Sequence, residues 1–205
     1  TCLQFMKGRP YINQGEELGM TNRKCRDFSE YRDIEIKNAY RDFVGGGILD
    51  EETMLKFVNA IGRDNARFPM HWDDSDNAGF TTGTPWISVN ENYKKINAAA
   101  QVNDPDSVFS YYKKLIELRH QMEIIVYGVY KSKAIEHPDV FAYTRTLGDE
   151  KLFVVCNFRE QEMDFTLEDG FTGDEKVLIS NYDDVVKTEN GIYLRPYEAK
   201  VFYRK

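Results

Sequence analysis

Hydrophobic and polar positions follow two different periods in the two parts of the chain. Over residues 104–122, Tyr111, Leu115 and Leu118 recur at helical spacing, which predicts an amphipathic helix. Beyond residue 124 apolar and polar positions alternate, as is typical of strands. The segments predicted as strands are 124–131, 140–146, 152–158, 163–167, 176–180, 192–194 and 199–203. Short strands separated by turn signals favour an antiparallel β-sandwich.

The N-terminal part shows helical spacing over residues 23–61, interrupted by three consecutive glycines at 45–47. Asp50 is expected to cap the second of these helices. The apolar run at residues 9–13 follows Gly8 and is consistent with one buried strand. A single strand with its helices does not make a complete α/β sheet, so we expect this part to need partner strands that the chain does not contain.

Residues 63–102 are rich in Asp, Asn, Gly, Thr and Pro and show no sustained period. An irregular segment of this length is usually functional or disordered. Its aromatic side chains Phe80, Trp86 and Tyr93 argue against disorder, because aromatic rings need a surface to pack on. Trp72, Phe80 and Trp86 could form a platform on which a sugar ring stacks, but packing within the long segment is the favoured interpretation.

The order of elements predicts an α+β chain of two regions. Residues 1–122 carry the lone strand, the helices and the long irregular segment, and residues 123–205 carry the all-β region. The boundary is placed where the helical period gives way to the alternating one.

Composition narrows the classes of function. Lys and Arg number 27 against 34 Asp and Glu, a formal charge of −7, which argues against a nucleic-acid partner. No apolar run approaches the length of about 20 residues that crosses a bilayer, so no membrane partner is expected. Cys2, Cys25 and Cys156 are sparse and odd in number, which favours reduced thiols and a cytoplasmic location. No cofactor is implied.

Two acidic groups are weighed and set aside as chemical sites. Glu16 and Glu17 are adjacent, and neighbours on a strand point to opposite faces, so a structural role is favoured over a catalytic pair. The acidic run that begins at Asp73 lacks the glycine at the sixth place and the glutamate at the twelfth that a calcium loop needs; Ala78 and Thr84 stand there. No metal site is expected.

Several motifs are specific when taken together and in order. They are GRPYINQGEE from residue 8, EYRDIE from residue 30, RDNAR from residue 63, PMHWDD from residue 69, NAGFTTG from residue 77 and LRPYEA from residue 194. This set resembles the oligo-1,6-glucosidase branch of the α-amylase superfamily of glycoside hydrolases. The resemblance runs nearly end to end. Arg9, Asn13, Phe68 and His71 depart from the family's pattern, which leaves fine specificity open.

The resemblance implies a fold and a reaction. The fold is the last βα portion of a (β/α)8 barrel followed by an antiparallel β-sandwich, and barrel active sites lie at the C-terminal ends of the strands. Such enzymes cleave with retention by means of two carboxylates about 5 Å apart. In the family the catalytic carboxylates come from earlier strands, so we expect none of them in this chain.

The same resemblance implies two substrate-binding residues. Arg63 matches the arginine that reaches the innermost glucose, and Glu35 matches an acidic residue that lines the next subsite. A guanidinium suits vicinal hydroxyls because its donors form a planar fork. A structural ion pair for Arg63 and a solvated helix face for Glu35 are the alternatives.

The leading hypothesis is therefore part of a retaining α-glucosidase that hydrolyses α-1,6 links in isomaltose-like oligosaccharides, inactive alone for want of its carboxylates. A sucrose isomerase or another α-glucosidase of the superfamily is the enzymatic alternative. A stand-alone carbohydrate-binding or structural β-sandwich module is the non-enzymatic one. Because the helices should expose apolar faces without the other barrel strands, we expect the chain to self-associate.

Overall fold

The computed structural model describes all of residues 1–205. The chain forms two compact units. One comprises Thr1–Tyr11 together with Lys113–Lys205, and the other comprises Ile12–Tyr112. The units group the first residues with the C-terminal part, whereas the division into residues 1–122 and 123–205 stays a prediction about domains.

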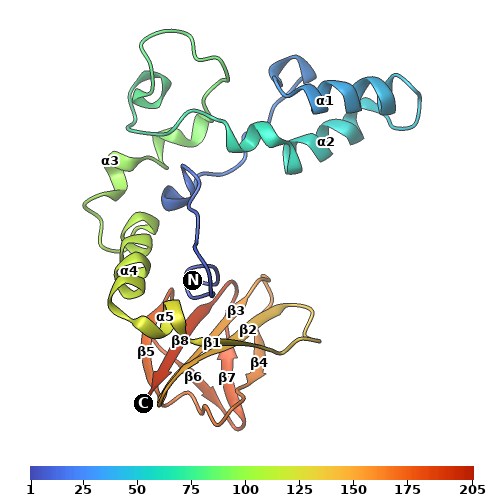
Figure 1. The fold of residues 1–205 in the computed structure, drawn as a ribbon. Helices are drawn as coiled ribbons and strands as arrows, with labels where there is room; N and C mark the ends of the chain where they lie inside the picture. The colour runs from blue at the N-terminus through green and yellow to red at the C-terminus, as the bar shows by residue number, and fades with distance from the viewer. The chain divides into compact units, whose positions relative to one another are not determined.

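The first unit is built on two antiparallel sheets (Figure 1). The five-stranded sheet has the order β1-β2-β3-β8-β5, and the three-stranded sheet has the order β4-β7-β6. The strands are β1 (Val129–Lys133), β2 (Val140–Leu147), β3 (Glu150–Asn157), β4 (Met163–Thr166), β5 (Lys176–Ser180), β6 (Val186–Thr188), β7 (Gly191–Leu194) and β8 (Ala199–Arg204). The prediction of an antiparallel module is confirmed.

Side chains from both sheets share one apolar core. Phe153 of the larger sheet packs against Phe165 of the smaller one, with ring centroids 6.3 Å apart, and against Phe171 at 5.3 Å. Ala142 on β2 and Ile192 on β7 are buried in the same cluster. The alternating pattern of the sequence thus places one face of each strand in the core.

The predicted strand at residues 124–131 is wrong in its first half. These residues begin as helix α5 (Glu123–Tyr127), and strand β1 starts only after Gly128. Ile124 and Ile125 lie on this helix, and both are fully buried. A short apolar run fits a buried helical turn as well as a strand, so periodicity could not decide between them. Strand β6 was not predicted, because its three residues are too few to show an alternating pattern.

The N-terminal segment, residues 1–6, lies on the outer face of β2, the face that points away from the core between the sheets. Arg145 is fully buried there and donates hydrogen bonds to four backbone carbonyls. Its Nη1 lies 2.6 Å from the oxygen of Phe5 and 2.7 Å from that of Ile125, and its Nη2 lies 2.7 Å from that of Gly128. The planar fork of a guanidinium can satisfy several acceptors that are fixed by the backbone. One side chain therefore fastens both the N-terminal segment and α5 to the sheet.

The second unit is helical and irregular. Its α-helices are α1 (Ile34–Ala39), α2 (Glu51–Ile61) and α3 (Ala98–Gln101), and α4 (Val108–Gln121) begins in it. Single 3₁₀ turns are found at Glu16–Leu18, Phe28–Glu30, Arg63–Ala66, Asp76–Gly79 and Glu91–Lys94, and a π turn extends α1 over Tyr40–Val44. No helix of the chain combines the length and apolarity needed to cross a membrane.

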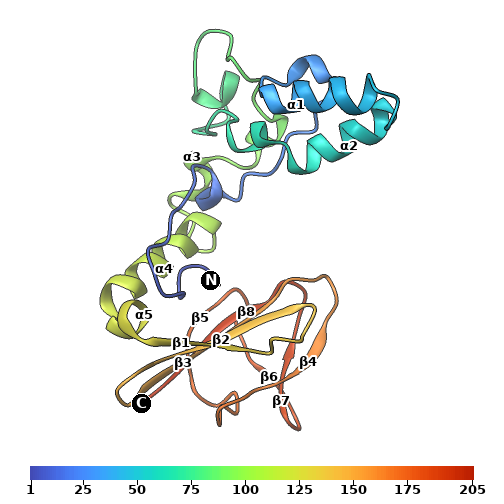
Figure 2. The same cartoon turned by 45° about the vertical axis from the view of Figure 1, so that its right-hand side comes forward.

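Helices α1 and α2 lie side by side (Figure 2). Ile36 of α1 and Met54 and Val58 of α2 are buried in one cluster with Tyr31. The predicted cap is confirmed, because the backbone N–H of Thr53 donates to Asp50 Oδ1 over 2.8 Å. The glycines at 45–47 turn the chain between the two helices.

Two expectations for the N-terminal region, residues 1–122, are wrong. Residues 9–13 form no strand, and the ring of Tyr11 is 84% exposed. A strand exists through hydrogen bonds to a neighbouring strand, and none of the eight strands pairs with this segment. The aromatic side chains of the irregular segment are not packed inside it either, since Trp72, Phe80 and Trp86 are 53%, 48% and 70% exposed.

The irregular segment is held instead by polar groups and small apolar residues. His71 and Ala78 are fully buried, and Ile87 is nearly so. Backbone N–H groups at Trp72 and Asp73 both donate to the carbonyl of Ala78. The fold of this segment thus depends on local hydrogen bonds, which composition alone does not reveal.

Candidate functional site

Two buried aspartates form ion pairs with two arginines. One aspartate, Asp33, lies at the start of α1, and the other, Asp64, lies in the turn that follows α2. Asp33 accepts from Nε and Nη2 of Arg63, each over 2.8 Å, and from Nη1 of Arg67 over 2.6 Å. Asp64 accepts from the same Nη1 of Arg67 over 3.0 Å. Both aspartate side chains are almost inaccessible, whereas Arg63 and Arg67 are 51% and 42% exposed.

Local backbone geometry places both carboxylates. Asp33 is the N-cap of α1, and its Oδ1 accepts the backbone N–H of Glu35 over 2.8 Å. Asp64 lies in the turn at Arg63–Ala66, and its Oδ2 accepts the backbone N–H groups of Arg32 and Asp33 over 2.7 and 3.0 Å. Buried carboxylates are stable only when hydrogen-bonded in this way. The two aspartates therefore join the start of α1 to the end of α2.

The cluster fixes the charge of its members. Hydrogen bonds from Arg63 and then from Arg67 hold the pKa of Asp33 well below its ordinary value, against the opposing effect of burial. The same bonds to Asp33 raise the pKa values of both arginines. Asp33 is thus a permanent anion at neutral pH and holds no proton to give as a general acid.

The structure brings together the two residues that the sequence singled out. Arg63 Nη1 lies 3.1 Å from Glu35 Oε1, and Glu35 is 69% exposed. The ion-pair alternative for Arg63 is also realised, through Asp33. These two readings are compatible, because the bonds to Asp33 use one edge of the guanidinium and leave N–H groups of Nη1 and Nη2 at the exposed side.

Sequence reasoning missed Asp33, Asp64 and Arg67. A signal existed for Asp33, because an aspartate directly before a helical pattern is a preferred N-cap. Asp64 and Arg67 lie inside the matched RDNAR motif, but nothing in their spacing shows that both bond to the start of another helix. Their role depends on the tertiary packing of α1 against α2.

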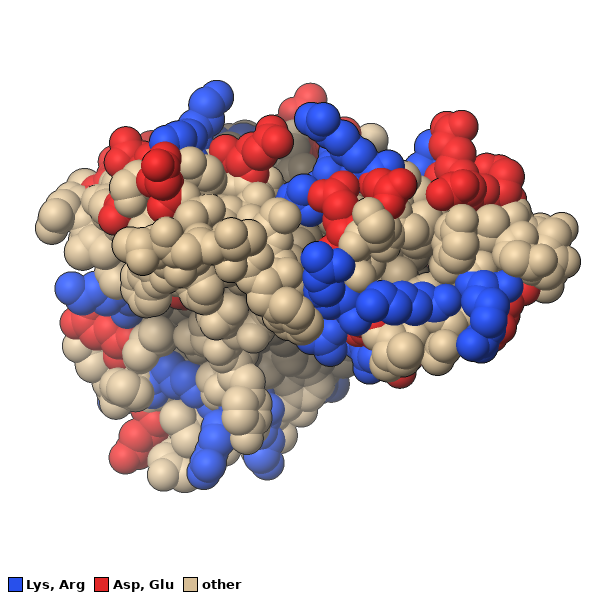
Figure 3. Space-filling view, turned by 90° about the horizontal axis from the view of Figure 1, so that it is seen from above, with Lys and Arg blue, Asp and Glu red and all other residues tan.

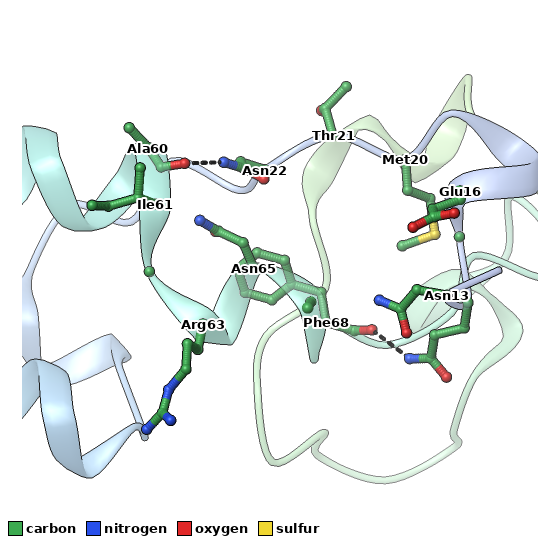
Figure 4. A pocket seen from close by; sticks show the side chains of 14 residues that line it. Asn13, Glu16, Met20, Thr21, Asn22, Ala60, Ile61, Arg63, Asn65 and Phe68 are labelled. Atoms are coloured by element: carbon green, nitrogen blue, oxygen red, sulfur yellow. Dashed lines mark hydrogen bonds between the residues drawn. The ribbon is translucent and has the colours of Figure 1, made fainter. Parts of the chain in front are cut away.

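A hollow of about 380 Å³ adjoins Arg63 (Figure 4). Its wall includes Asn13, Glu16, Asn65 and Phe68. The guanidinium of Arg63 is directed away from Glu16 and Asn13 in this view. The Oδ1 atom of Asn65 is buried and accepts no hydrogen bond from the protein. This acceptor lies beneath the surface of the hollow, so the exposed donors and acceptors of the site are those of Arg63 and Glu35.

The adjacent glutamates do not face each other as a pair. Both lie in the turn at Glu16–Leu18, and Glu17 Oε2 accepts the backbone N–H of Gly15 over 2.8 Å. That bond closes a turn in which Gly15 has a φ of 91°, a conformation that favours glycine. The acidic run at Asp73 has a similar local use, since Asp73 Oδ1 accepts the N–H of Ser75 over 2.8 Å.

Acidic and basic side chains are interspersed on the face of the molecule drawn in Figure 3. Among residues 1–205 no group of three or more His, Cys, Asp or Glu side chains is arranged to hold a metal ion. The residues at the site supply charged hydrogen-bonding groups: two arginines with exposed edges and one exposed carboxylate.

Family models match most of the chain. Residues 1–128 match the family described as alpha amylase, catalytic domain, and residues 140–201 match the alpha-amylase SusG C-terminal domain. The first match contains the arginine and aspartate cluster, and the second contains most of the two sheets.

Curated relatives agree with these matches. The chain is 52% identical over 204 residues to the oligo-1,6-glucosidase of Parageobacillus thermoglucosidasius, with 98% of this chain and 36% of that protein covered. It is 51% identical to the oligo-1,6-glucosidase of Bacillus cereus, with 100% and 37% covered. It is 45% identical to the trehalose-6-phosphate hydrolase of Bacillus subtilis, with 98% and 36% covered. The chain thus spans little more than a third of the length of these glycoside hydrolases.

Solved structures show the same fold. The trehalose-6-phosphate hydrolase of Bacillus licheniformis superposes with a TM-score of 0.89 at 44% identity, covering 98% of this chain and 36% of that one. The isomaltulose synthase of Erwinia rhapontici, in complex with sucrose, superposes with a TM-score of 0.90 at 40% identity and the same coverage. The chain belongs to the α-amylase family, and it corresponds to part of the catalytic domain together with the C-terminal domain.

Proposed function

We propose that this chain supplies substrate-binding residues to a retaining α-glucosidase that hydrolyses α-1,6-glucosidic links in isomaltose-like oligosaccharides. The similarity to oligo-1,6-glucosidases at 51–52% identity supports this substrate class. The proposed location of the enzyme is the cytoplasm, where thiols such as its three free cysteines are kept reduced.

The observation that carries the proposal is the position of Arg63 between Asp33 and Glu35. Asp33 holds the guanidinium in one orientation through two hydrogen bonds, while half of the side chain stays accessible. A charged donor fixed in advance binds a hydroxyl pair with little loss of side-chain entropy. The exposed Glu35, 3.1 Å from Arg63, adds acceptors for a neighbouring hydroxyl.

The proposal places no catalytic carboxylate in this chain. A retaining enzyme needs a carboxylate that can attack the sugar and a second one that can give a proton. Asp33 and Asp64 are buried and already bonded to arginines and backbone N–H groups. Neither is free to approach a sugar carbon. The resemblance to the family implies that the proposed catalytic pair comes from residues that precede this chain in its relatives.

The experiment compares isomaltose hydrolysis by the 205-residue chain with hydrolysis by a chain extended upstream through a full barrel. We expect turnover from the extended protein and none from the short chain. The anomeric form of the released glucose, followed by NMR, reports retention. Turnover by the short chain would show that the carboxylates have been misplaced.

Sucrose isomerisation is a second candidate, because solved isomaltulose and trehalulose synthases are 40% identical to the chain and superpose with TM-scores of 0.89 to 0.90. Product analysis of the extended protein with sucrose separates the two. Isomaltulose or trehalulose as the main product, without hydrolysis of isomaltose, would favour the isomerase.

A further inference from the structure

Two of the three cysteines lie together on the outer face of the five-stranded sheet. Phe141 pairs with Cys156, and Tyr143 pairs with Val154 on the neighbouring strand. Because side chains alternate between the faces of a sheet, Phe141, Tyr143 and Cys156 share one face. The core between the sheets takes the intervening residues, such as Ala142 and Val155. Cys156 therefore faces away from that core and yet is buried.

The N-terminal segment, which covers this face, carries the other cysteine, Cys2. Tyr143 Oη donates to the carbonyl of Cys2 over 2.6 Å, and Arg145 Nη1 donates to the carbonyl of Phe5 over 2.6 Å. These bonds hold the N-terminal segment on the sheet beside Cys156. A hydrogen bond joins the two thiols, and both are free.

The two thiols differ in the way that a reacting pair requires. The hydrogen bond with Cys156 lowers the pKa of the Cys2 thiol, in opposition to burial. The Cys156 thiol keeps its proton, because that bond and then burial raise its pKa. Cys2 is also the more accessible of the two, being half-buried where Cys156 is 3% exposed. A thiolate is the nucleophilic form, so Cys2 is the sulfur that an oxidant meets first.

We propose that Cys2 and Cys156 form a redox-sensitive pair, in which a peroxide oxidises Cys2 and Cys156 then closes a disulfide that fastens the N-terminal segment to the sheet. In the first step the Cys2 thiolate attacks one oxygen of hydrogen peroxide, the O–O bond breaks, and a sulfenic acid and hydroxide form. In the second step the Cys156 sulfur attacks the sulfenic sulfur; its proton and the departing hydroxyl leave as water.

Cys25 is the internal comparison. It belongs to the other compact unit, and its neighbour is an arginine, with Arg23 Nη1 3.2 Å from its sulfur. Burial, the largest influence, raises its pKa. Cys25 is therefore expected to stay reduced under peroxide concentrations that link Cys2 to Cys156.

The test treats the 205-residue chain with hydrogen peroxide, blocks the remaining thiols by alkylation and maps tryptic peptides without reduction. Trypsin releases Cys2 in residues 1–7 and Cys156 in residues 152–159. The expected product is these two peptides joined, with the mass of the pair less two hydrogen atoms, and dithiothreitol should separate them. The linked peptide should form within single chains, at a yield that does not depend on protein concentration.

Three variants complete the test. Cys25→Ser should keep the linked peptide. Cys156→Ser, or Cys156→Ala if the serine variant does not fold, should lose it and leave a sulfenic acid on Cys2 that dimedone traps. Cys2→Ser should lose it with no sulfenic acid in residues 152–159. The proposal is overturned if peroxide takes Cys2 to a sulfinic acid with no link, or if links through Cys25 or between chains predominate.

Discussion

Arg63 and Asp33 meet through two parallel hydrogen bonds of 2.8 Å, one from Nε and one from Nη2, across two elements that are thirty residues apart in the chain. The carboxylate is buried and the guanidinium is half-exposed. One side of the pair therefore supports the packing of α1 against the end of α2, and the other remains open to a ligand. Structural and binding roles coexist in the same arginine.

Replacing Asp33 should destabilise the second unit. Asp33→Ala removes the cap of α1, worth about 1 kcal/mol, and charge-assisted bonds worth about 1.5–3 kcal/mol. We expect a loss of roughly 2–4 kcal/mol in the free energy of unfolding, measured by urea denaturation. Asp42→Ala is the control, since its ion pair with Arg41 is exposed on both sides. Equal stability of the two variants would show that the cluster does not hold α1 in place.

The ion pair also predicts an effect of acid. The pKa of Asp33 is lowered in the folded chain, so its contribution to stability is complete above the ordinary aspartate value of about 3.9. It is lost as the pH falls from that value toward the lowered one. Stability at pH 3 relative to pH 6 should therefore fall less in Asp33→Asn than in the unchanged chain. An equal fall in both would contradict this assignment.

His71 predicts a second, separate pH window. Its Nδ1 lies 2.8 Å from the carbonyl of Ile96, while its Nε2 is buried without a partner. Burial lowers the pKa of His71 in the folded chain, so stability is full above the unfolded value of about 6.5 and declines as the pH falls below it. His71→Gln should flatten the stability between pH 7 and pH 5, measured by thermal unfolding. His120→Gln, at an exposed position, should leave the decline unchanged.

The buried guanidinium of Arg145 is expected to hold the N-terminal segment and α5 on the sheet. Arg145→Lys keeps the charge but loses the fork that reaches Phe5, Ile125 and Gly128. We expect a loss of about 2–4 kcal/mol in the free energy of unfolding and faster amide hydrogen exchange in residues 1–6. The control is Arg159→Lys, whose ion pair with Asp139 is more than half exposed on the arginine side. Unchanged exchange in residues 1–6 would contradict this role.

Self-association of the chain stays a prediction, and the exposed apolar side chains of α2 are the surface on which to test it. Phe57 and Ile61 are 54% and 80% exposed on α2, beside a hollow of about 210 Å³ that Ile36 and Met54 also line. Phe57→Ser with Ile61→Ser should shift the chain toward monomer in light scattering, because it removes apolar surface. Ile135→Ser, at a 74% exposed position outside this hollow, is the control. A monomeric unchanged chain would refute the prediction.

Much of the fold followed from the sequence for physical reasons. The alternating pattern of β2 and β3 identified strands because one face of each is buried between the sheets. Asp50 identified the start of α2 because a carboxylate before a helix accepts orphan N–H groups. The short apolar run at Ile124 was predicted as a strand but forms helix α5. A buried run with no periodic pattern fits a helix and a strand equally well. Residues 9–13 misled because a strand is defined by its neighbour.

The candidate site followed only in part. The resemblance pointed to Arg63 and Glu35, and the structure places their side chains 3.1 Å apart. Asp33 and Asp64 escaped notice because their importance comes from burial and from partners some thirty residues away. Single-sequence patterns carry local spacing, whereas a buried carboxylate network is a property of the packed chain.

The effect of Arg63 on isomaltose hydrolysis tests the central proposal most directly. In a chain extended upstream through a full barrel, kcat/KM for isomaltose would be measured for Arg63→Lys and for the control Arg41→Lys, whose arginine is 71% exposed and paired with Asp42. Loss of charge-assisted bonds of about 1.5–3 kcal/mol predicts a fall of roughly 10- to 100-fold for Arg63→Lys, with no change for the control. Both variants should fold, as shown by unchanged circular dichroism. Undiminished kcat/KM in folded Arg63→Lys would contradict the assignment of Arg63 to substrate binding.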